Sequence, residues 1–429
     1  MIRKDVAIIG SGPGGATIAK ELAKKGKSVA ILEWGKDNPP ASPLFADPFR
    51  FMGGMKLKSQ AFLKTVNEPH MEIVRCITIG GSTLAYGGVS WDPPYELFEK
   101  FGIALQEYAE EIKKEITIKP LNPDQMGIGA KIIEKSALDL GLDWHRIDRL
   151  FSDPEKFKQT SYFFGDKTGA RWDAREWVLE SVRNGASLYA QTFCEDIIIE
   201  NGKVSGIEGV NASGERIKIM ADAVVVAAGG IGSPMILNKL NIEEAGKDIF
   251  IDPYFLAIGY IDKPVLGAEV TRQAGILLED DGISMGDAAL PVKAYRTLAL
   301  RYKKYNKIFQ KKKALSMLVE IDDDLSGSVG DACRINKVLS QRDTEKLEKG
   351  RGIALKILEN AGAKDIWFTN IAGVHPGGAC KIGSVVDANL ETKIKNLYVC
   401  DASVIPESGA IPPILTILSL AKRLSRHLT

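Results

Sequence analysis

A glycine-rich turn near the start of the chain constrains the possible folds more than any other feature. The turn occupies residues 10–15, with the sequence Gly-Ser-Gly-Pro-Gly-Gly, and follows the short apolar run of residues 6–9. A helical pattern over residues 16–25 comes next, and a second apolar strand over residues 28–32 ends in Glu33. This order of strand, glycine turn, helix, strand and acid is the fingerprint of a dinucleotide-binding βαβ unit.

Each position of this unit has a mechanical role. Gly10 permits the tight turn, Gly12 lets the backbone approach a pyrophosphate, and Gly15 lets the helix pack against the strand. Free N–H groups at the helix N-terminus face the phosphates. A carboxylate at Glu33 accepts ribose hydroxyls and so disfavours NADP, but the turn alone does not separate NAD from FAD, and a glycine turn without a ligand is the alternative. The predicted cofactor residues of this unit are Gly10, Gly12, Pro13, Gly14, Gly15 and Glu33.

The charge balance and the cysteine pattern exclude several classes of protein. The 56 Lys and Arg residues nearly equal the 55 Asp and Glu residues, whereas a dedicated nucleic-acid-binding protein carries a clear basic excess. The five cysteines form no C-x-x-C pair, so neither a disulfide framework nor a zinc site is expected. The sequence shows no secretory leader and no apolar stretch of about 18 residues. We therefore expect a soluble, cytoplasmic protein of two or three domains.

Three later segments suggest which dinucleotide is bound. The first is Gly-Gly-Ser-Thr-Leu-Ala-Tyr-Gly-Gly at residues 80–88, and the second is Ala-Gly-Gly-Ile-Gly-Ser-Pro at residues 228–234. The third extends from His-Pro-Gly-Gly-Ala-Cys at residues 375–380, through residues 397–403, to Pro-Pro-Ile-Leu-Thr-Ile at residues 412–417. In this order and spacing, the segments resemble the glucose–methanol–choline (GMC) family of flavoprotein oxidoreductases. The resemblance covers under half of the chain and implies FAD as the cofactor.

The resemblance also implies an α/β fold in two parts. A Rossmann-type FAD-binding domain is assembled from discontinuous segments, and a substrate domain of sheet and helices covers the flavin. The residues agree with this, because residues 186–219 are typical of a strand meander with turns at Asn201-Gly202 and Ser213-Gly214, and residues 335–362 favour a helix. The FAD-binding domain is expected at residues 1–90, 186–250 and 371–429, where the last segment includes the catalytic loop. A lid or linker is expected within the first of these segments, at about 36–70. Residues 91–185 are expected to form a mostly substrate or cap region, and residues 251–370 the substrate domain.

Further cofactor contacts follow from the resemblance alone. Gly80, Gly81 and Ser82 are expected along the pyrophosphate and flavin, and the backbone of Cys194 is expected at the adenine. Asp401 is expected to hold the ribityl–phosphate region. We expect non-covalent FAD, because no His or Cys stands in residues 80–91. The remaining predicted cofactor residues are Ala228, Gly229 and Ala402, together with Pro413 and Ile414, where the N-terminus of a last helix could stabilise anionic reduced flavin.

His375 is the candidate catalytic base. It is the one histidine of four that lies inside a motif segment, and an imidazole suits removal of an alcohol proton as hydride leaves for the flavin. The family usually has a second catalytic His or Asn just before the proline that opens the last helix, whereas this sequence has Pro412 there. Three interpretations stay open: His375 acts alone, the reaction is not ordinary alcohol oxidation, or the second contact comes from Glu407, Ser408 or Tyr86.

The leading hypothesis is an FAD-dependent dehydrogenase that oxidises a hydroxyl of a small organic substrate to a carbonyl. The alternatives are a flavoprotein of the same fold with lyase or isomerase activity, and a flavin electron-transfer protein. The electron acceptor could be oxygen, a quinone or a protein.

A basic segment at residues 301–313 stands apart from these motifs. It contains seven Lys or Arg residues and no acid, interleaved with Tyr302, Tyr305, Ile308 and Phe309 at spacings that put an apolar stripe on one helical face. One interpretation is a surface helix whose aromatic side chains cover the substrate domain. The other is a docking surface for an anionic lipid surface, an acidic electron-transfer partner or an anionic substrate.

Overall fold

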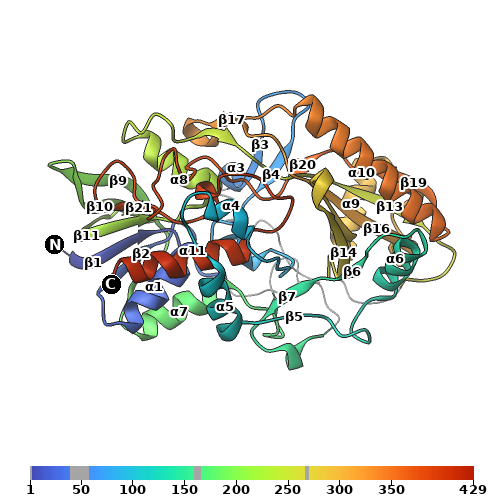
Figure 1. The fold of residues 1–429 in the computed structure, drawn as a ribbon, viewed down its shortest axis with the longest axis horizontal. Helices are drawn as coiled ribbons and strands as arrows, with labels where there is room; N and C mark the ends of the chain where they lie inside the picture. The colour runs from blue at the N-terminus through green and yellow to red at the C-terminus, as the bar shows by residue number, and fades with distance from the viewer. Residues whose placement is uncertain (1, 39–57, 159–165, 266–269) are drawn as a thin grey trace.

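The computed structural model describes residues 2–38, 58–158, 166–265 and 270–429, and it contains two large sheets with helices around them (Figure 1). The predicted α/β fold class is therefore confirmed. The suggested lid or linker at about 36–70 includes residues 39–57, which lie outside the described residues. Among the helices of the described ranges, none combines the length and the apolar character that crossing a membrane requires.

The first sheet is seven-stranded, with the order β8-β2-β1-β11-β10-β9, and β21 also pairs with β11. Strands β1, β2, β8, β11 and β21 pair in parallel, so their carboxyl ends lie at one edge, where ligands bind in folds of this kind. The glycine turn, Glu33, Gly229 and Asp401 all follow strands at this edge. The strands are β1 (Ile2–Ile9), β2 (Val29–Leu32), β8 (Ser187–Tyr189), β9 (Thr192–Glu200), β10 (Lys203–Asn211), β11 (Arg216–Val226) and β21 (Leu397–Val399).

The predicted meander is present, with two differences in its strand boundaries. The third meander strand, after the turn at Ser213-Gly214, continues beyond residue 219 as β11, because β1 pairs with it in one register as far as Val226. The first meander strand is divided into β8 and β9. Gln191 has a φ of 53° between them, which turns the chain from pairing with β2 to pairing with β10.

Helices α1 (Pro13–Lys24), α7 (Ala174–Arg183) and α11 (Ile414–His427) lie together against the first sheet, with α1 in contact with both others (Figure 1). The buried Lys20 of α1 lies 3.5 Å from the centre of the Trp177 ring and pairs with Glu115 of α5 (Gln106–Glu115). Lys422 of α11 pairs with the same carboxylate. The cations in this helix layer are thus compensated, as burial requires.

The second sheet is nine-stranded, with the order β3-β4-β20-β13-β16-β15-β14-β6, and β19 also pairs with β13. Apart from the parallel pair β4 and β20, its strands pair in antiparallel fashion. Its strands are β3 (Phe62–Lys64), β4 (Glu72–Val74), β6 (His145–Arg146), β13 (Pro253–Tyr260), β14 (Ala274–Leu278), β15 (Ile283–Asp287), β16 (Ala314–Ile321), β19 (Lys364–Phe368) and β20 (Ala372–Gly373).

Helices cover both faces of this sheet because its central strands are apolar on both sides. Phe255 and Ala257 of β13 join a core with α10 (Gln341–Asn360) and α6 (Ile128–Asp139). Leu256 and Ile258 face the other way and join a core with α9 (Val292–Arg301). This alternation follows the two-residue period of a strand.

The remaining α-helices and strands of the described residues are α3 (Lys58–Ala61), α4 (Tyr95–Glu99), α8 (Gly229–Asn238), β5 (Thr117–Pro120), β7 (Asp148–Phe151), β12 (Lys247–Ile249), β17 (Ser326–Val329) and β18 (Ile335–Asn336).

Two predicted helices are shorter than expected. Helix α10 begins at Gln341 and not near residue 335, because Ser340 and Asp343 form a capping box there. The single helical face expected for residues 301–313 is wrong. Helix α9 ends at Arg301, Lys303 takes a φ of 57°, and two short 3₁₀ turns follow at Tyr305–Lys307 and Lys311–Lys313.

Candidate active site

The two glycine segments of the sequence meet at the carboxyl edge of the first sheet. A Cβ atom on Gly81 would lie 3.0 Å from the Cα atom of Gly12, so only glycine permits this approach without a shift. The Gly80 amide donates to the Ser11 hydroxyl at 3.2 Å. Beside Gly12 itself, a Cβ atom would meet nothing within 4 Å among the described residues. The backbone at the start of α1 therefore borders open space, which is what a bound pyrophosphate requires.

Glu33 lies at the same turn, directly after β2. Its carboxylate accepts hydrogen bonds from the Ser11 amide at 3.0 Å, the Ser11 hydroxyl at 2.7 Å and the Gly35 amide at 2.7 Å. Burial raises the pKa of Glu33, and these donors offset part of that effect. The structure thus brings Glu33 and the glycine turn together, as predicted from their spacing, while the contact with a ribose stays a prediction.

Asp401 connects two other predicted cofactor segments. Its carboxylate accepts from the amides of Gly229 and Ser403, each at 2.8 Å, and from the hydroxyls of Ser233 and Ser403. Both oxygens are therefore engaged by the protein, and Asp401 holds the start of α8 against the turn that contains Ala402. The direct contact expected from Asp401 to the ribityl–phosphate region stays a prediction.

The other predicted cofactor residues lie on different elements. Cys194 is buried in β9, and burial raises the pKa of its thiol to about 12, so only its backbone is suited to a contact. Ser82 lies in a 3₁₀ turn and accepts from the Cys76 amide at 3.2 Å. Pro413 precedes the first residue of α11, Ile414, where the helix N-terminus is formed.

His375 lies where the chain passes from the second sheet to the first. The amides of Val374 and His375 donate to the Ile251 carbonyl at 2.9 and 3.3 Å. One residue later, a Cβ atom on Gly230 would lie only 1.8 Å from the Pro376 carbonyl oxygen, so glycine is required at the start of α8. Through these contacts His375 is fixed between the second sheet and the carboxyl edge of the first sheet.

Two buried carboxylates flank one nitrogen of the His375 ring. The Nδ1 atom lies 3.1 Å from Asp252 Oδ2 and 2.8 Å from Glu320 Oε1. The side chain of His375 is 19% exposed, whereas those of Asp252 and Glu320 are 2% and 0% exposed. Because both acids face Nδ1, Nε2 is the nitrogen left to meet a substrate.

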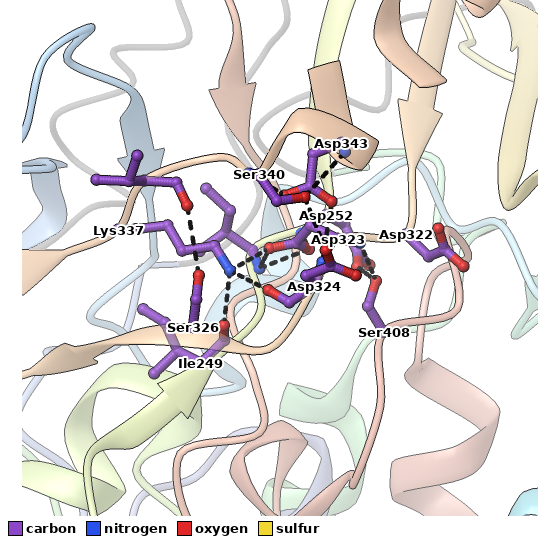
Figure 2. A network of polar contacts seen from close by, with 12 residues as sticks. Ile249, Asp252, Asp322, Asp323, Asp324, Ser326, Lys337, Ser340, Asp343 and Ser408 are labelled. Carbon is purple, nitrogen blue, oxygen red and sulfur yellow. Dashed lines mark hydrogen bonds and ion pairs between the residues drawn. The ribbon is translucent and has the colours of Figure 1, made fainter. Parts of the chain in front are cut away.

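A second layer of polar contacts fixes Asp252 (Figure 2). Asp252 has a φ of 44°, a backbone conformation that is uncommon for residues other than glycine. Its amide and that of Ile251 donate to the Asp323 carboxylate, at 2.9 and 3.1 Å. Lys337 lies 2.7 Å from the same carboxylate, with both side chains fully buried, and Ser408 donates to Asp252. The network thus holds the Asp252 carboxylate in position from behind.

The buried charges balance when His375 carries a proton. Three carboxylates, Asp252, Glu320 and Asp323, face two basic side chains, since Arg272 lies 2.5 Å from Glu320 and Lys337 pairs with Asp323. An imidazolium supplies the third positive charge. Burial alone would lower the pKa of His375, but Glu320 and Asp252 outweigh burial and raise it to about 9.

The same three groups are close enough to bind a metal ion. The ligand atoms of Asp252, Glu320 and His375 lie within 4.8 Å of one another. However, Arg272 already compensates Glu320, and a proton on His375 compensates Asp252 without a divalent cation. Charge balance therefore favours a proton-binding cluster.

Sequence reasoning missed Asp252 and Glu320, which the sheet brings to His375. Glu320 pairs across the sheet with Tyr254, and Asp252 comes directly before β13, so the register brings both acids to the same end of these strands. One signal was available, because Glu320 is a lone acid inside the apolar strand β16. A charge in such a strand is rarely tolerated without a partner.

Of the three residues suggested as a second catalytic group, Ser408 alone is connected to His375 by the contacts described. Ser408 joins the His375 network through Asp252, whereas Glu407 is exposed. The Tyr86 hydroxyl donates to the Trp172 carbonyl at 2.7 Å, and burial raises its pKa strongly, so it is not placed to accept a proton. The other three histidines lie away from this cluster: His70 beside Glu68, His145 against Trp91 and His427 against Tyr398.

Comparisons with known proteins agree with this arrangement. Residues 57–254 and 326–421 match the N-terminal and C-terminal parts of GMC oxidoreductases, and residues 8–38 match an NAD(P)-binding Rossmann-like domain. The chain belongs to the GMC oxidoreductase family. The resemblance drawn from the glycine-rich and C-terminal segments is thereby confirmed, and the protein is an oxidoreductase.

Individual relatives extend over nearly the whole chain. The uncharacterized protein MJ1450 of Methanocaldococcus jannaschii is 29% identical over 99% of both chains. Long-chain-alcohol oxidase FAO3 of Arabidopsis thaliana is 25% identical over 100% of this chain and 68% of its own. The crystal structure of pyridoxine 4-oxidase from Mesorbium loti has a TM-score of 0.76 at 18% identity, covering 99% of both chains, which supports the fold.

Proposed function

We propose that this GMC oxidoreductase is an FAD-dependent dehydrogenase that oxidises a hydroxyl of an organic substrate to a carbonyl. The observation that carries the proposal is the position of His375, whose Nδ1 atom is held by Asp252 and Glu320 at the junction of the two sheets. An imidazole fixed in this way is suited to proton transfer through Nε2.

The residues present fit non-covalent FAD. Open space beside Gly12, the amides at the start of α1 and the buried carboxylate of Glu33 suit a pyrophosphate and an adenosine ribose. The N-terminus of α11, at Ile414, suits the negative charge of a reduced flavin. When bound, FAD supplies the acceptor for a hydride.

The chain's own residues would account for the proton. Neutral His375 accepts the hydroxyl proton at Nε2 while the substrate carbon loses its hydrogen with two electrons, and the C–O bond becomes a carbonyl. The proton on Nδ1 remains in the hydrogen bond to Asp252, with the Glu320 carboxylate beside it. The two carboxylates then stabilise the imidazolium, which makes His375 a stronger base than a free imidazole.

The names of the relatives suggest which substrates to test first. One relative is named for long-chain alcohols and one structural neighbour for pyridoxine, which also carries hydroxyl groups, so we propose an alcohol as the substrate class. The test mixes purified protein anaerobically with a series of long-chain alcohols and with pyridoxine while flavin absorbance is followed. A substrate of this class should bleach the oxidised flavin.

Pro412 supports a second candidate function, a lyase or isomerase reaction on the same flavin fold. Proline there removes the second polar contact that the family resemblance implies for alcohol oxidation. Turnover of a hydroxyl compound without flavin bleaching would favour this candidate and overturn the first.

A further inference from the structure

Helix α9 and the segment after it form a surface of unusual composition. Residues 288–319 contain nine Lys or Arg residues and no Asp or Glu. We call a set of nine exposed basic and apolar residues in this region the basic–aromatic surface. It comprises Val292, Lys293, Arg296, Leu300, Lys303, Tyr305, Phe309, Lys312 and Lys313.

Large apolar side chains on this surface point away from the protein. Phe309 is 81% exposed, Tyr305 is 63% exposed and Leu300 is 51% exposed. The inward side of α9 is already occupied, since Tyr295 is buried with Trp367 in the core against the sheet. Packing against the second sheet therefore explains the inward residues, but it does not explain the exposed ones.

Part of this surface is joined by direct contacts and by helix geometry. Val292, Arg296 and Leu300 follow one another at intervals of four residues, so they share one face of α9. The guanidinium of Arg296 lies 5.2 Å from the centre of the Phe309 ring, which joins the later segment to that face. Apolar and basic groups are thus interleaved within one surface.

Most of the charge on this surface is uncompensated. Arg301 pairs with Glu72 and Lys307 pairs with Asp365. By contrast, no acid of the described residues forms an ion pair with the other exposed cations on this patch. These cations are Lys293, Arg296, Lys303, Lys312 and Lys313.

We propose that the basic–aromatic surface binds the face of an anionic lipid bilayer. Lysine and arginine side chains would contact lipid phosphates, while Phe309, Tyr305 and Leu300 enter the boundary between headgroups and acyl chains. An acidic protein partner would account for the cations, but not for a phenyl ring exposed to this extent among them. The lipid surface accounts for both.

The surface adjoins the segment that leads to His375. The Tyr302 hydroxyl accepts from the Asn370 amide at 2.6 Å, and Arg301 contacts β4, which pairs with β20 just before His375. Lipid binding here would therefore bring the membrane beside the strands that carry the catalytic loop.

The test is flotation of the purified full chain with phosphatidylcholine vesicles, with and without phosphatidylglycerol. We expect binding to the mixed vesicles only, weakening as salt is added. The double variant Lys312→Glu/Lys313→Glu should weaken binding at least roughly tenfold. Phe309→Ser should also weaken it roughly tenfold, because the ring no longer enters the boundary.

Matched variants on β9, β10 and β12, outside the basic–aromatic surface, provide the controls. Lys203→Glu/Lys247→Glu changes the same number of exposed charges, and Ile199→Ser removes an exposed apolar side chain from β9. Neither should alter vesicle binding. Absence of binding to the mixed vesicles, or equal loss in the controls, would overturn the proposal. Loss in the lysine variant with full binding of Phe309→Ser would overturn insertion and reduce the contact to electrostatic attraction between the lysines and the lipid phosphates.

Discussion

The Oδ2 atom of Asp252 lies 3.1 Å from the Nδ1 atom of His375, although 123 residues separate them in the chain. The backbone at Asp252 has a φ of 44°, and amide bonds to Asp323 hold it there. This relationship fixes which ring nitrogen of His375 faces the substrate side. Asp252 is thus a positioning residue for the proposed base.

Replacing His375 with Ala should retain the flavin and slow its reduction. The glycine turn and Glu33 lie apart from His375, so cofactor binding should survive. Loss of a general base costs roughly 10²–10⁴-fold, and we expect the upper part of this range because Pro412 offers no second polar group. Anaerobic flavin reduction at saturating substrate measures the effect.

The variant His145→Ala, which removes an exposed histidine, provides the matched control for His375→Ala. In this control, substrate should reduce the flavin at the wild-type rate. A loss of less than about threefold in His375→Ala, with flavin content intact, would show that the proton is accepted elsewhere.

The pH dependence should report the charge on His375. Proton acceptance needs the neutral ring, and Glu320 and Asp252 raise the pKa of His375 to about 9 against burial. The kcat/KM value should therefore rise with pH and level off above about pH 9. In Asp252→Asn one carboxylate is lost, the imidazolium is less stabilised, and the midpoint should move to lower pH.

The shift of the midpoint to lower pH distinguishes a positioning role of Asp252 from a role in folding alone. A damaged fold would lower the rate at every pH and leave the midpoint in place. Asp166→Asn, which removes a buried carboxylate from another loop, should keep the wild-type midpoint. An unchanged midpoint in Asp252→Asn would exclude the proposed role of Asp252.

Local motifs were predictable from the sequence, and the proton-binding cluster was not. The glycine turn and Glu33 lie within one βαβ unit, so short-range spacing fixes their relation. Asp252 and Glu320 meet His375 only through the register of β13 and β16. Acids at strand ends are common, and no spacing rule distinguishes these two before the sheet is known.

For the basic segment at residues 301–313, the local pattern itself predicted the wrong secondary structure. Its spacing favoured one helical stripe, yet Lys303 turns the chain and Tyr302 packs inward while Tyr305 and Phe309 point outward. Periodicity describes which residues share a face only where the helix continues. The excess of basic residues in the segment, by contrast, is evident from its composition and does not depend on a continuous helix.

Replacing Glu33 with Ala should weaken flavin binding. If its carboxylate meets the ribose, the lost charged hydrogen bond costs roughly 1–3 kcal/mol. Titration of apoprotein with FAD, followed by flavin fluorescence, gives the dissociation constant. Glu407→Ala, which removes an exposed acid, should bind as the wild type does, and an unchanged constant in Glu33→Ala would refute the ribose assignment.

Replacing Lys337 with Met should destabilise the fold. Lys337 Nζ lies 2.7 Å from Asp323 and also donates to the carbonyls of Ile249 and Asp324, at 2.8 and 2.6 Å, so its removal leaves a buried carboxylate without its cation (Figure 2). Breaking such a pair costs about 3–5 kcal/mol of unfolding free energy. Denaturant unfolding of the wild type, Lys337→Met and the double variant Lys337→Met/Asp323→Asn measures this.

The double variant should be more stable than Lys337→Met, because the introduced amide is neutral and its oxygen can still accept from the Ile251 and Asp252 amides. Equal stabilities of the wild type and Lys337→Met would mean that the ion pair does not hold this network.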